Sequence, residues 1–358
     1  MNSSFVQAVR LVSAREIQAR IRSKAFVVSA LILIGMVVAS IVVGGVVSKA
    51  TADDTTPVAV VDGVSLPTTS GLDVTKSASV DDAERLVTKG DVDAAIVPSD
   101  DPLGYKVVGL DEAPSEVVSA LSVTPRIELL DPDALPGGLV YLIAIAFGVV
   151  YFASAVTFGQ SIAQSVVEEK STRVVEILMS AIPARALLAG KVLGNSIMAF
   201  AQIVAVAVAA IVTLAVTGQD NTFAMLGPSI LWFIGFFAIG FVLLASLFAA
   251  AAVLVSRQED VGSVTTPVMM LVMIPYFLII VAYDNPTILG IMSYVPFSAP
   301  IGMPMRIFLG TAEWWEPILS LVIVAASVVA VVVIGARVYE NALLRTGSRV
   351  KLSEALRG

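Results

Sequence analysis

The chain has 358 residues, of which 57% are hydrophobic and only 14% are charged, and its mean hydropathy is +0.90. A soluble domain carries roughly 25% charged residues and about 45–50% apolar ones, so this composition predicts a membrane protein. Histidine and cysteine are both absent. Their absence excludes disulfides, thiolate nucleophiles, Ser-His-Asp triads and the usual zinc, haem and iron–sulfur ligand sets. We therefore expect neither catalytic residues nor a metal site on this chain.

The net charge of -7 is unevenly divided along the chain. Residues 48–136 hold 6 basic and 17 acidic residues, a net charge of -11, whereas the remaining 269 residues carry a net charge of +4. A compact acidic block therefore lies within an apolar chain. The low isoelectric point belongs to this block and indicates no nucleic-acid partner.

A basic segment, residues 1–24, precedes the first predicted span. It carries five Lys or Arg residues on a loosely apolar helix, which favours an interfacial elbow helix on the cytoplasmic leaflet. The alternative is an unordered basic leader. The first span, residues 25–47, is longer than the apolar region of a signal peptide, about 7–15 residues, so we expect an uncleaved anchor.

The acidic block, residues 48–138, is predicted to form a small extracytoplasmic α/β domain between the first and second spans. Strand patterns occur over residues 58–63, 94–98 and 105–108, and helix patterns over residues 80–89 and 114–122. Strands that alternate with helices favour a compact α/β unit. Its carboxylates are dispersed and match no calcium-binding loop. A solvated acidic surface is therefore favoured over a cation site.

Five further stretches are long and apolar enough to cross a bilayer core of about 30 Å, which needs roughly 20 residues per helix. They are residues 139–158, 192–216, 228–255, 261–283 and 317–336. With the first span they predict an α-helical integral membrane protein with six transmembrane helices. The last five form one domain, residues 139–338, followed by a basic tail, residues 339–358. If both termini are cytoplasmic, 15 of the 22 Lys and Arg residues lie on the cytoplasmic side, which agrees with the positive-inside rule. We therefore expect a multi-pass protein of a bacterial cytoplasmic membrane with both termini in the cytoplasm.

The loop between the second and third spans holds a charged amphipathic segment within residues 161–183. Glu169 and Arg173 are four residues apart, and Arg173 and Glu176 are three apart, so on one helix they would form an ion-paired ridge. Pro183 would end this helix. Such a helix is suited to docking another protein; the alternative is an ordinary solvated linker.

This segment resembles the permease subunits of type-2 ABC (ATP-binding cassette) exporters. The resemblance rests on Glu168-Glu169-Lys170, Arg173, Glu176-Ile177-Leu178, Ser180, Pro183, Arg185 and Gly190-Lys191, in that order. The outside domain after the first span is similar to the sodium-export, NatB-like branch. The resemblance implies a coupling helix that meets an ATP-binding subunit. Its partner-binding residues would be Glu168, Glu169, Lys170, Arg173, Glu176, Ile177 and Leu178.

The segment over residues 284–316 is apolar but interrupted by four prolines. It cannot be a straight span, and we expect a re-entrant or interfacial hairpin on the outside. In the resembled family this position forms such a hairpin near the exit of the translocation route. The residues that carry this part of the resemblance are Pro296, Phe297, Pro300 and Arg306.

The chain carries no Gly-x-x-x-x-Gly-Lys-Ser/Thr phosphate-binding loop. The six predicted spans also lack Asp, Glu, Lys and Arg, which disfavours an ion-coupled carrier. With the resemblance, these absences predict a permease subunit without enzymatic activity or a cofactor of its own. It would export a substrate with ATP and Mg²⁺ bound by a partner. The implied complex has two ATP-binding subunits and a second permease chain, an identical copy or a paralogue.

Two other functions remain open from the sequence. One is a membrane-anchored binding or sensor module in which the outer α/β domain carries the activity. The other is an enzyme within the membrane, which the missing His, Cys and buried carboxylates disfavour. Sodium, a drug, a peptide and a lipid are all compatible with the exporter as its substrate.

Overall fold

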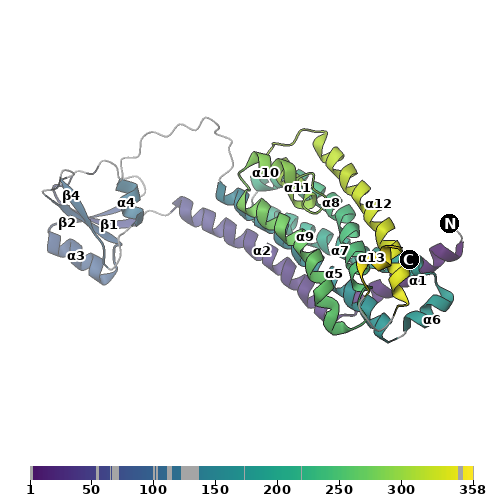
Figure 1. Ribbon diagram of the computed structural model, residues 1–358. Coiled ribbons are helices and arrows are strands. Elements are labelled where there is room, and N and C mark those ends of the chain that lie inside the picture. The colour runs from purple at the N-terminus through teal and green to yellow at the C-terminus, as the bar shows by residue number, and fades with distance from the viewer. Residues whose placement is uncertain are drawn as a thin grey trace. The chain divides into compact units, whose positions relative to one another are not determined.

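The chain folds into a helical unit and a sheet-containing unit in the computed structural model (Figure 1). The helical unit comprises residues 1–42 and 135–358, and the sheet-containing unit comprises residues 43–134. The structure describes residues 3–53, 56–64, 66, 72–99, 101, 104–110, 115–121, 137–172, 174–218, 220–345 and 350–357.

Six helices in the described part of the chain are long and apolar enough to cross a membrane. They are α2 (Lys24–Asp53), α5 (Gly137–Ser171), α7 (Ala184–Val216), α8 (Asp220–Ala252), α9 (Val261–Val281) and α12 (Glu316–Leu343). Each overlaps one predicted span, which confirms the six-helix architecture. α5 and α7 run past the predicted span ends because each helix continues beyond its apolar stretch into a segment with charged residues.

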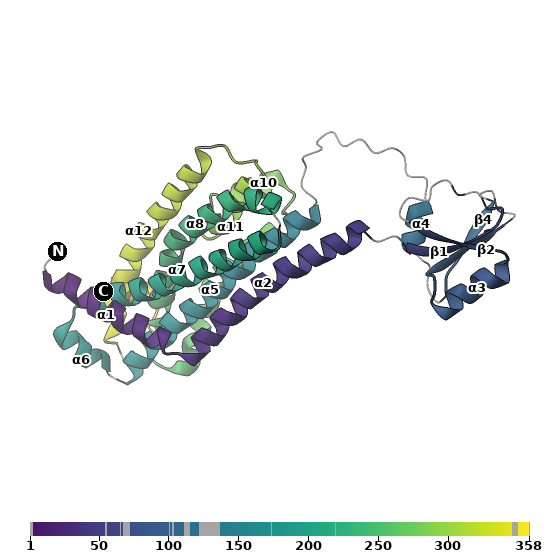
Figure 2. The same ribbon diagram turned by 180° about the vertical axis from the view of Figure 1, so that it is seen from behind.

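Shorter helices lie between and around the long ones. They are α1 (Ser3–Ile21), α6 (Val174–Ala181), the 3-10 turn η1 (Gln258–Asp260), α10 (Pro286–Met292), α11 (Ala299–Phe308) and α13 (Leu352–Arg357). α1, which lies along the start of α7 (Figure 2), occupies the segment expected to be an elbow helix. α6 lies between α5 and α7 in the chain.

An aromatic seam joins α5 to α8 at the centre of the helical unit. The ring centroids of Phe147 and Phe233 are 4.9 Å apart, and those of Tyr151 and Phe237 are 5.9 Å apart in an edge-on arrangement. Phe147 and Tyr151 are one helical turn apart, as are Phe233 and Phe237, so each pair shares a helix face. This seam fixes α5 against α8 by close aromatic packing.

The proline-rich segment forms two short helices, α10 and α11, joined by a turn. Asn285 begins α10, where its side chain accepts hydrogen bonds from the backbone N–H groups of Thr287 and Ile288, both at 3.1 Å. α11 is buried against α8. A Cβ atom on Gly240 of α8 would lie 2.9 Å from the Pro300 ring, so the glycine permits the close contact.

The second unit is built on a four-stranded sheet in the order β2-β1-β3-β4. Its elements are β1 (Thr56–Val61), β2 (Leu72–Ser77), α3 (Val80–Lys89), β3 (Ala94–Pro98), β4 (Tyr105–Val108) and α4 (Ser115–Leu121). β1 pairs in parallel with β2 and β3, and β4 is antiparallel to β3. The sheet carries one helix on each face, since alternate residues of β1 enter two separate cores.

Local sequence explains the boundaries of α3. Ser79 accepts a hydrogen bond from the Asp82 backbone N–H at 3.2 Å, and Gly90 ends the helix in the left-handed region with φ 76°. The helix coincides with the predicted residues 80–89. β2 is not among the strands predicted from the sequence, because this edge strand buries only Leu72 and Ser77 and lacks a continuous apolar run.

Candidate functional site

A buried lysine joins three helices at the end of the helical unit where α7 begins. The Nζ atom of Lys191 on α7 lies 3.1 Å from Oε1 of Glu16 on α1 and 3.0 Å from Oε1 of Glu169 on α5. The Lys191 side chain is 0% exposed, and both carboxylates are buried. We call Glu16, Glu169 and Lys191 the charged triad.

Neighbouring polar groups complete this cluster. Lys191 also donates to Ser165 Oγ at 2.5 Å, and Asn195 Nδ2 donates to Glu16 Oε2 at 3.3 Å. Asn195 Oδ1 accepts from Arg20 Nε at 3.3 Å. Burial lowers the pKa of Arg20 from its usual value, and the nearby Glu16 charge partly opposes this. Arg15 reaches Glu169 from the surface at 3.4 Å, so each buried charge has an opposite charge beside it.

Lys170, the residue after Glu169, is buried in a different direction. Its Nζ donates to the backbone carbonyls of Val253 at 2.5 Å and Ala342 at 2.9 Å. These carbonyls lie at the ends of α8 and α12, where helices leave C=O groups unpaired and carry partial negative charge. Lys170 therefore ties the ends of α8 and α12 to the end of α5.

Two of the expected partner-binding residues thus face the protein interior. Glu169 and Lys170 are 6% and 1% exposed and are held by the contacts above. The chain leaves the α-helix after Ser171 and begins α6 at Val174, so the expected single helix is two helices. Arg173, the middle member of the expected ridge, lies outside the described residues. Glu169 cannot form that ridge while it contacts Lys191.

Two of the other expected residues, Glu176 and Ile177, lie at the surface of α6. Ile177 is 72% exposed, and Glu176 is also exposed. Val175 is fully buried and Leu178 is half-buried, so one side of the helix is anchored on the bundle. Glu168, at the end of α5, is exposed as well. Ile177 is therefore an exposed apolar side chain on a short helix that lies, in the chain, between two candidate membrane spans.

The second group of expected site residues lies around α10 and α11. Arg306 forms a two-pronged pair with Glu316, with N–O distances of 3.0 and 2.6 Å, and also donates to Ser293 Oγ at 3.2 Å. Tyr294 donates to Glu316 Oε1 at 2.7 Å. Burial, with this hydrogen bond and the Glu316 charge, raises the pKa of Tyr294 above its usual value. Arg306 therefore ties α11 to the start of α12.

The prolines of this group line the turn and the start of α11. Pro296 and Phe297 are half-buried in the turn, and Pro300 is buried at the start of α11 against α8. Their packing gives the segment a defined shape. Whether a substrate passes them stays a prediction.

The sequence pattern did not predict that Glu16, Lys191 and Asn195 form a single cluster. One indication was present, since Glu16 is the only acidic residue among the first 52 residues and stands among basic neighbours. Its partner lies 175 positions away, a separation that local spacing does not reveal. Within the described residues, no group of acidic side chains could hold a metal ion.

Comparison with known proteins places these features in context. A family model described as "ABC-2 family transporter protein" matches residues 24–337. The chain is 29% identical over 223 residues to the uncharacterized protein YhaP of Bacillus subtilis, covering 59% of this chain and 52% of YhaP. It is 26% identical over 228 residues to the uncharacterized protein MJ1024 of Methanocaldococcus jannaschii, covering 62% of this chain and 53% of that protein. The chain thus spans about half the length of these curated relatives. No solved structure matches it.

Proposed function

The chain belongs to the ABC-2 family of transporter proteins, and we propose that it is the permease subunit of an exporter driven by a separate ATP-binding subunit. The substrate would leave the cytoplasm through the long helices, while ATP and Mg²⁺ would be bound by the partner. The family and the six long apolar helices support a multi-pass membrane subunit.

The observation that carries the proposal is the exposed surface of α6, with Ile177 at its centre. α6 lies between α5 and α7 in the chain, and these two helices are joined directly by the pair Glu169–Lys191. A subunit that binds and displaces α6 would therefore act on both helices together. This arrangement suits the transfer of movement from a soluble ATPase to the membrane helices.

The distribution of ionisable groups supports an external energy source. The sequence contains no phosphate-binding loop of the ATPase type. The charged triad lies near the ends of α5 and α7 and its charges are paired, and the central parts of the six spans carry no Asp, Glu, Lys or Arg. A proton or ion relay through the membrane would need such groups along its route.

The complete complex is proposed to contain two ATP-binding subunits and two permease chains, identical or paralogous. Both termini and α6 would face the cytoplasm of a bacterial cell, as the distribution of Lys and Arg favours. The acidic α/β unit would then lie outside the cytoplasm, as in the NatB-like branch that the sequence resembles. Arg306 and the α10–α11 segment would lie at the same outer side, near the exit.

The test is co-purification of the tagged chain from its host with the substitution Ile177→Glu. A carboxylate at this exposed apolar site should weaken association with the ATP-binding subunit and lower ATPase activity of the complex at least tenfold. Ile291→Glu is the matched control, since Ile291 on α10 is also exposed, at 57%, but lies in the proposed outer segment. The proposal fails if the wild-type chain purifies without an ATP-binding subunit. The role of α6 fails if Ile177→Glu assembles and hydrolyses ATP normally.

A further inference from the structure

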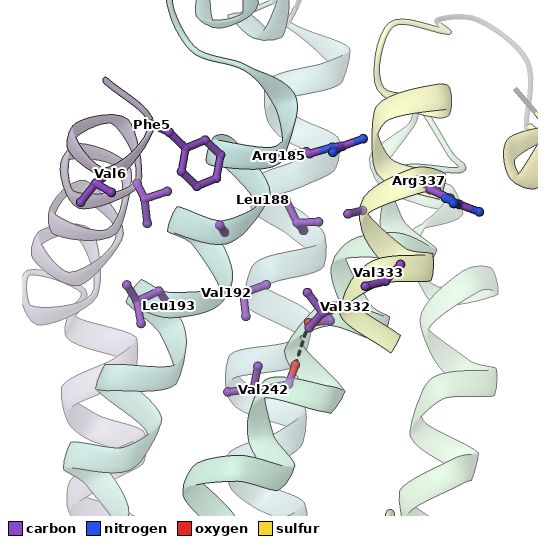
Figure 3. Close-up of a pocket in the computed structure, with 14 residues that line it drawn as sticks. Phe5, Val6, Arg185, Leu188, Val192, Leu193, Val242, Val332, Val333 and Arg337 are labelled. Carbon is purple, nitrogen blue, oxygen red and sulfur yellow. Dashed lines mark hydrogen bonds between the residues drawn. The ribbon is translucent and has the colours of Figure 1, made fainter. Parts of the chain in front are cut away.

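An open apolar groove of about 690 Å³ runs between α1, α7, α8 and α12 (Figure 3). Val192 and Leu193 of α7, Val242 of α8 and Val332 and Val333 of α12 line it. On α7 the lining extends from Arg185 to Leu193, a rise of about 12 Å along the helix. Most of the lining residues belong to candidate membrane spans, so lipid tails are the expected surroundings of this groove.

Two arginines lie at one end of the groove, where α7 begins and α12 approaches its end (Figure 3). Arg185 pairs with Glu340 on α12, with Nε and Oε1 2.7 Å apart. The guanidinium of Arg337 is exposed, and the structure shows no ion pair for it among the described residues. Glu340 offsets one of the two cations, so this end of the groove keeps a net positive charge. Ser246, the other polar lining side chain, is occupied by a hydrogen bond to the Val242 carbonyl at 2.8 Å.

The combination selects an occupant with a long apolar part and one anionic end. An acyl chain would lie in the groove against its apolar walls. A phosphate would lie beside the guanidinium groups, which bind phosphate oxygens through charge-assisted hydrogen bonds. A zwitterionic headgroup carries its own cation, which would meet two arginines. Basic pockets between membrane helices are suited to anionic headgroups for the same reason.

We propose that the groove between α1, α7, α8 and α12 binds an anionic glycerophospholipid, with one acyl chain along α7 and α12 and the phosphate at Arg185 and Arg337. The bound lipid would cover the side of α7 that faces away from α5. Because α1 forms one wall through Phe5 and Val6, the lipid would also support the contact between α1 and α7. This site is independent of α6 and of any ATP-binding partner.

The test is native mass spectrometry of the purified full-length chain with added phosphatidylglycerol or phosphatidylcholine of identical acyl chains. One phosphatidylglycerol should bind at least tenfold more tightly than phosphatidylcholine. Arg337→Gln should weaken phosphatidylglycerol binding about fivefold, the effect expected for one basic side chain near a charged lipid surface. Ala189→Phe, which fills the groove without changing its charge, should weaken binding of that lipid as well.

Arg345→Gln is the matched control, because Arg345 is exposed just beyond the end of α12 but does not line the groove. Its phosphatidylglycerol binding should equal that of the unsubstituted chain. Equal binding of the two lipids, or unchanged binding by Arg337→Gln and Ala189→Phe, overturns the proposal. A second chain seated in the groove also overturns it. That outcome would appear as cross-linking between copies through single cysteines at Leu193 and Val333.

Discussion

At Lys191, one buried ammonium group holds two carboxylates from helices far apart in the sequence. Placing three charges in a water-poor site is costly for each of them, and the cost is met only while all are paired. Ser165 accepts a further hydrogen bond from Lys191 Nζ, and Asn195 donates one to the other carboxylate oxygen of Glu16, Oε2. The cluster therefore links α1, α5 and α7 through one side chain.

Replacing Lys191 with Met should lower the free energy of unfolding by about 3–5 kcal/mol, because Glu16 and Glu169 would remain buried beside each other without their cation. The measurement is thermal or denaturant unfolding of the purified chain in detergent. Lys351→Met provides the control, since Lys351 is exposed on the same end of the helical unit. Equal stability of the two variants would show that the carboxylates are not held by Lys191.

At the scale of elements, α1 approaches α7 closely because α7 carries glycine where they meet. A Cβ atom on Gly190 would lie 2.5 Å from Val12 Cβ, and one on Gly194 would lie 2.9 Å from the Ser13 carbonyl oxygen. Contacts this short require the helices to separate. Gly190 and Gly194 are one helical turn apart, so both lie on the face of α7 that contacts α1.

The substitution Gly194→Ala should therefore loosen α1 and raise amide hydrogen exchange over Ser3–Ile21 at least tenfold. In helix α8, Gly235→Ala is the matched control, because no atom outside its own helix segment lies within 4 Å of a Cβ built there. The control should leave exchange in α1 unchanged. If both variants protect α1 equally, the close approach of α1 and α7 is not what holds α1 in place.

Sequence patterns predict the helices of this chain better than they predict which charged side chains are buried. Length and hydropathy predicted all six long helices, and the helix pattern over residues 80–89 predicted α3. Local spacing predicted that Glu169 and Glu176 lie on one helix. In the structure they lie on two helices, α5 and α6, and the contact with Lys191 keeps the Glu169 side chain buried. Contacts with residues far away in the sequence therefore determine that the side chains of Glu169 and Lys170 point into the protein. Their charge alone made them look like surface residues.

At the scale of the whole molecule, the proposed orientation makes a direct prediction. The chain lacks cysteine, so a single introduced thiol can be labelled without background. Thr88→Cys on α3 should react with a membrane-impermeant maleimide in intact cells, whereas Ser171→Cys at the end of α5 should react only after permeabilisation. Both positions are exposed in the structure. The opposite labelling pattern would contradict the proposed orientation.

The charged triad also sets an order for biogenesis. Glu16 is synthesised first, Glu169 follows, and Lys191 emerges last from the ribosome. Until α7 enters the membrane, the two carboxylates lack the buried cation that joins them, and α1 and α5 are linked by the pair of the surface arginine Arg15 with Glu169. We therefore expect the contact that joins α1, α5 and α7 to form late in synthesis, once Lys191 is present.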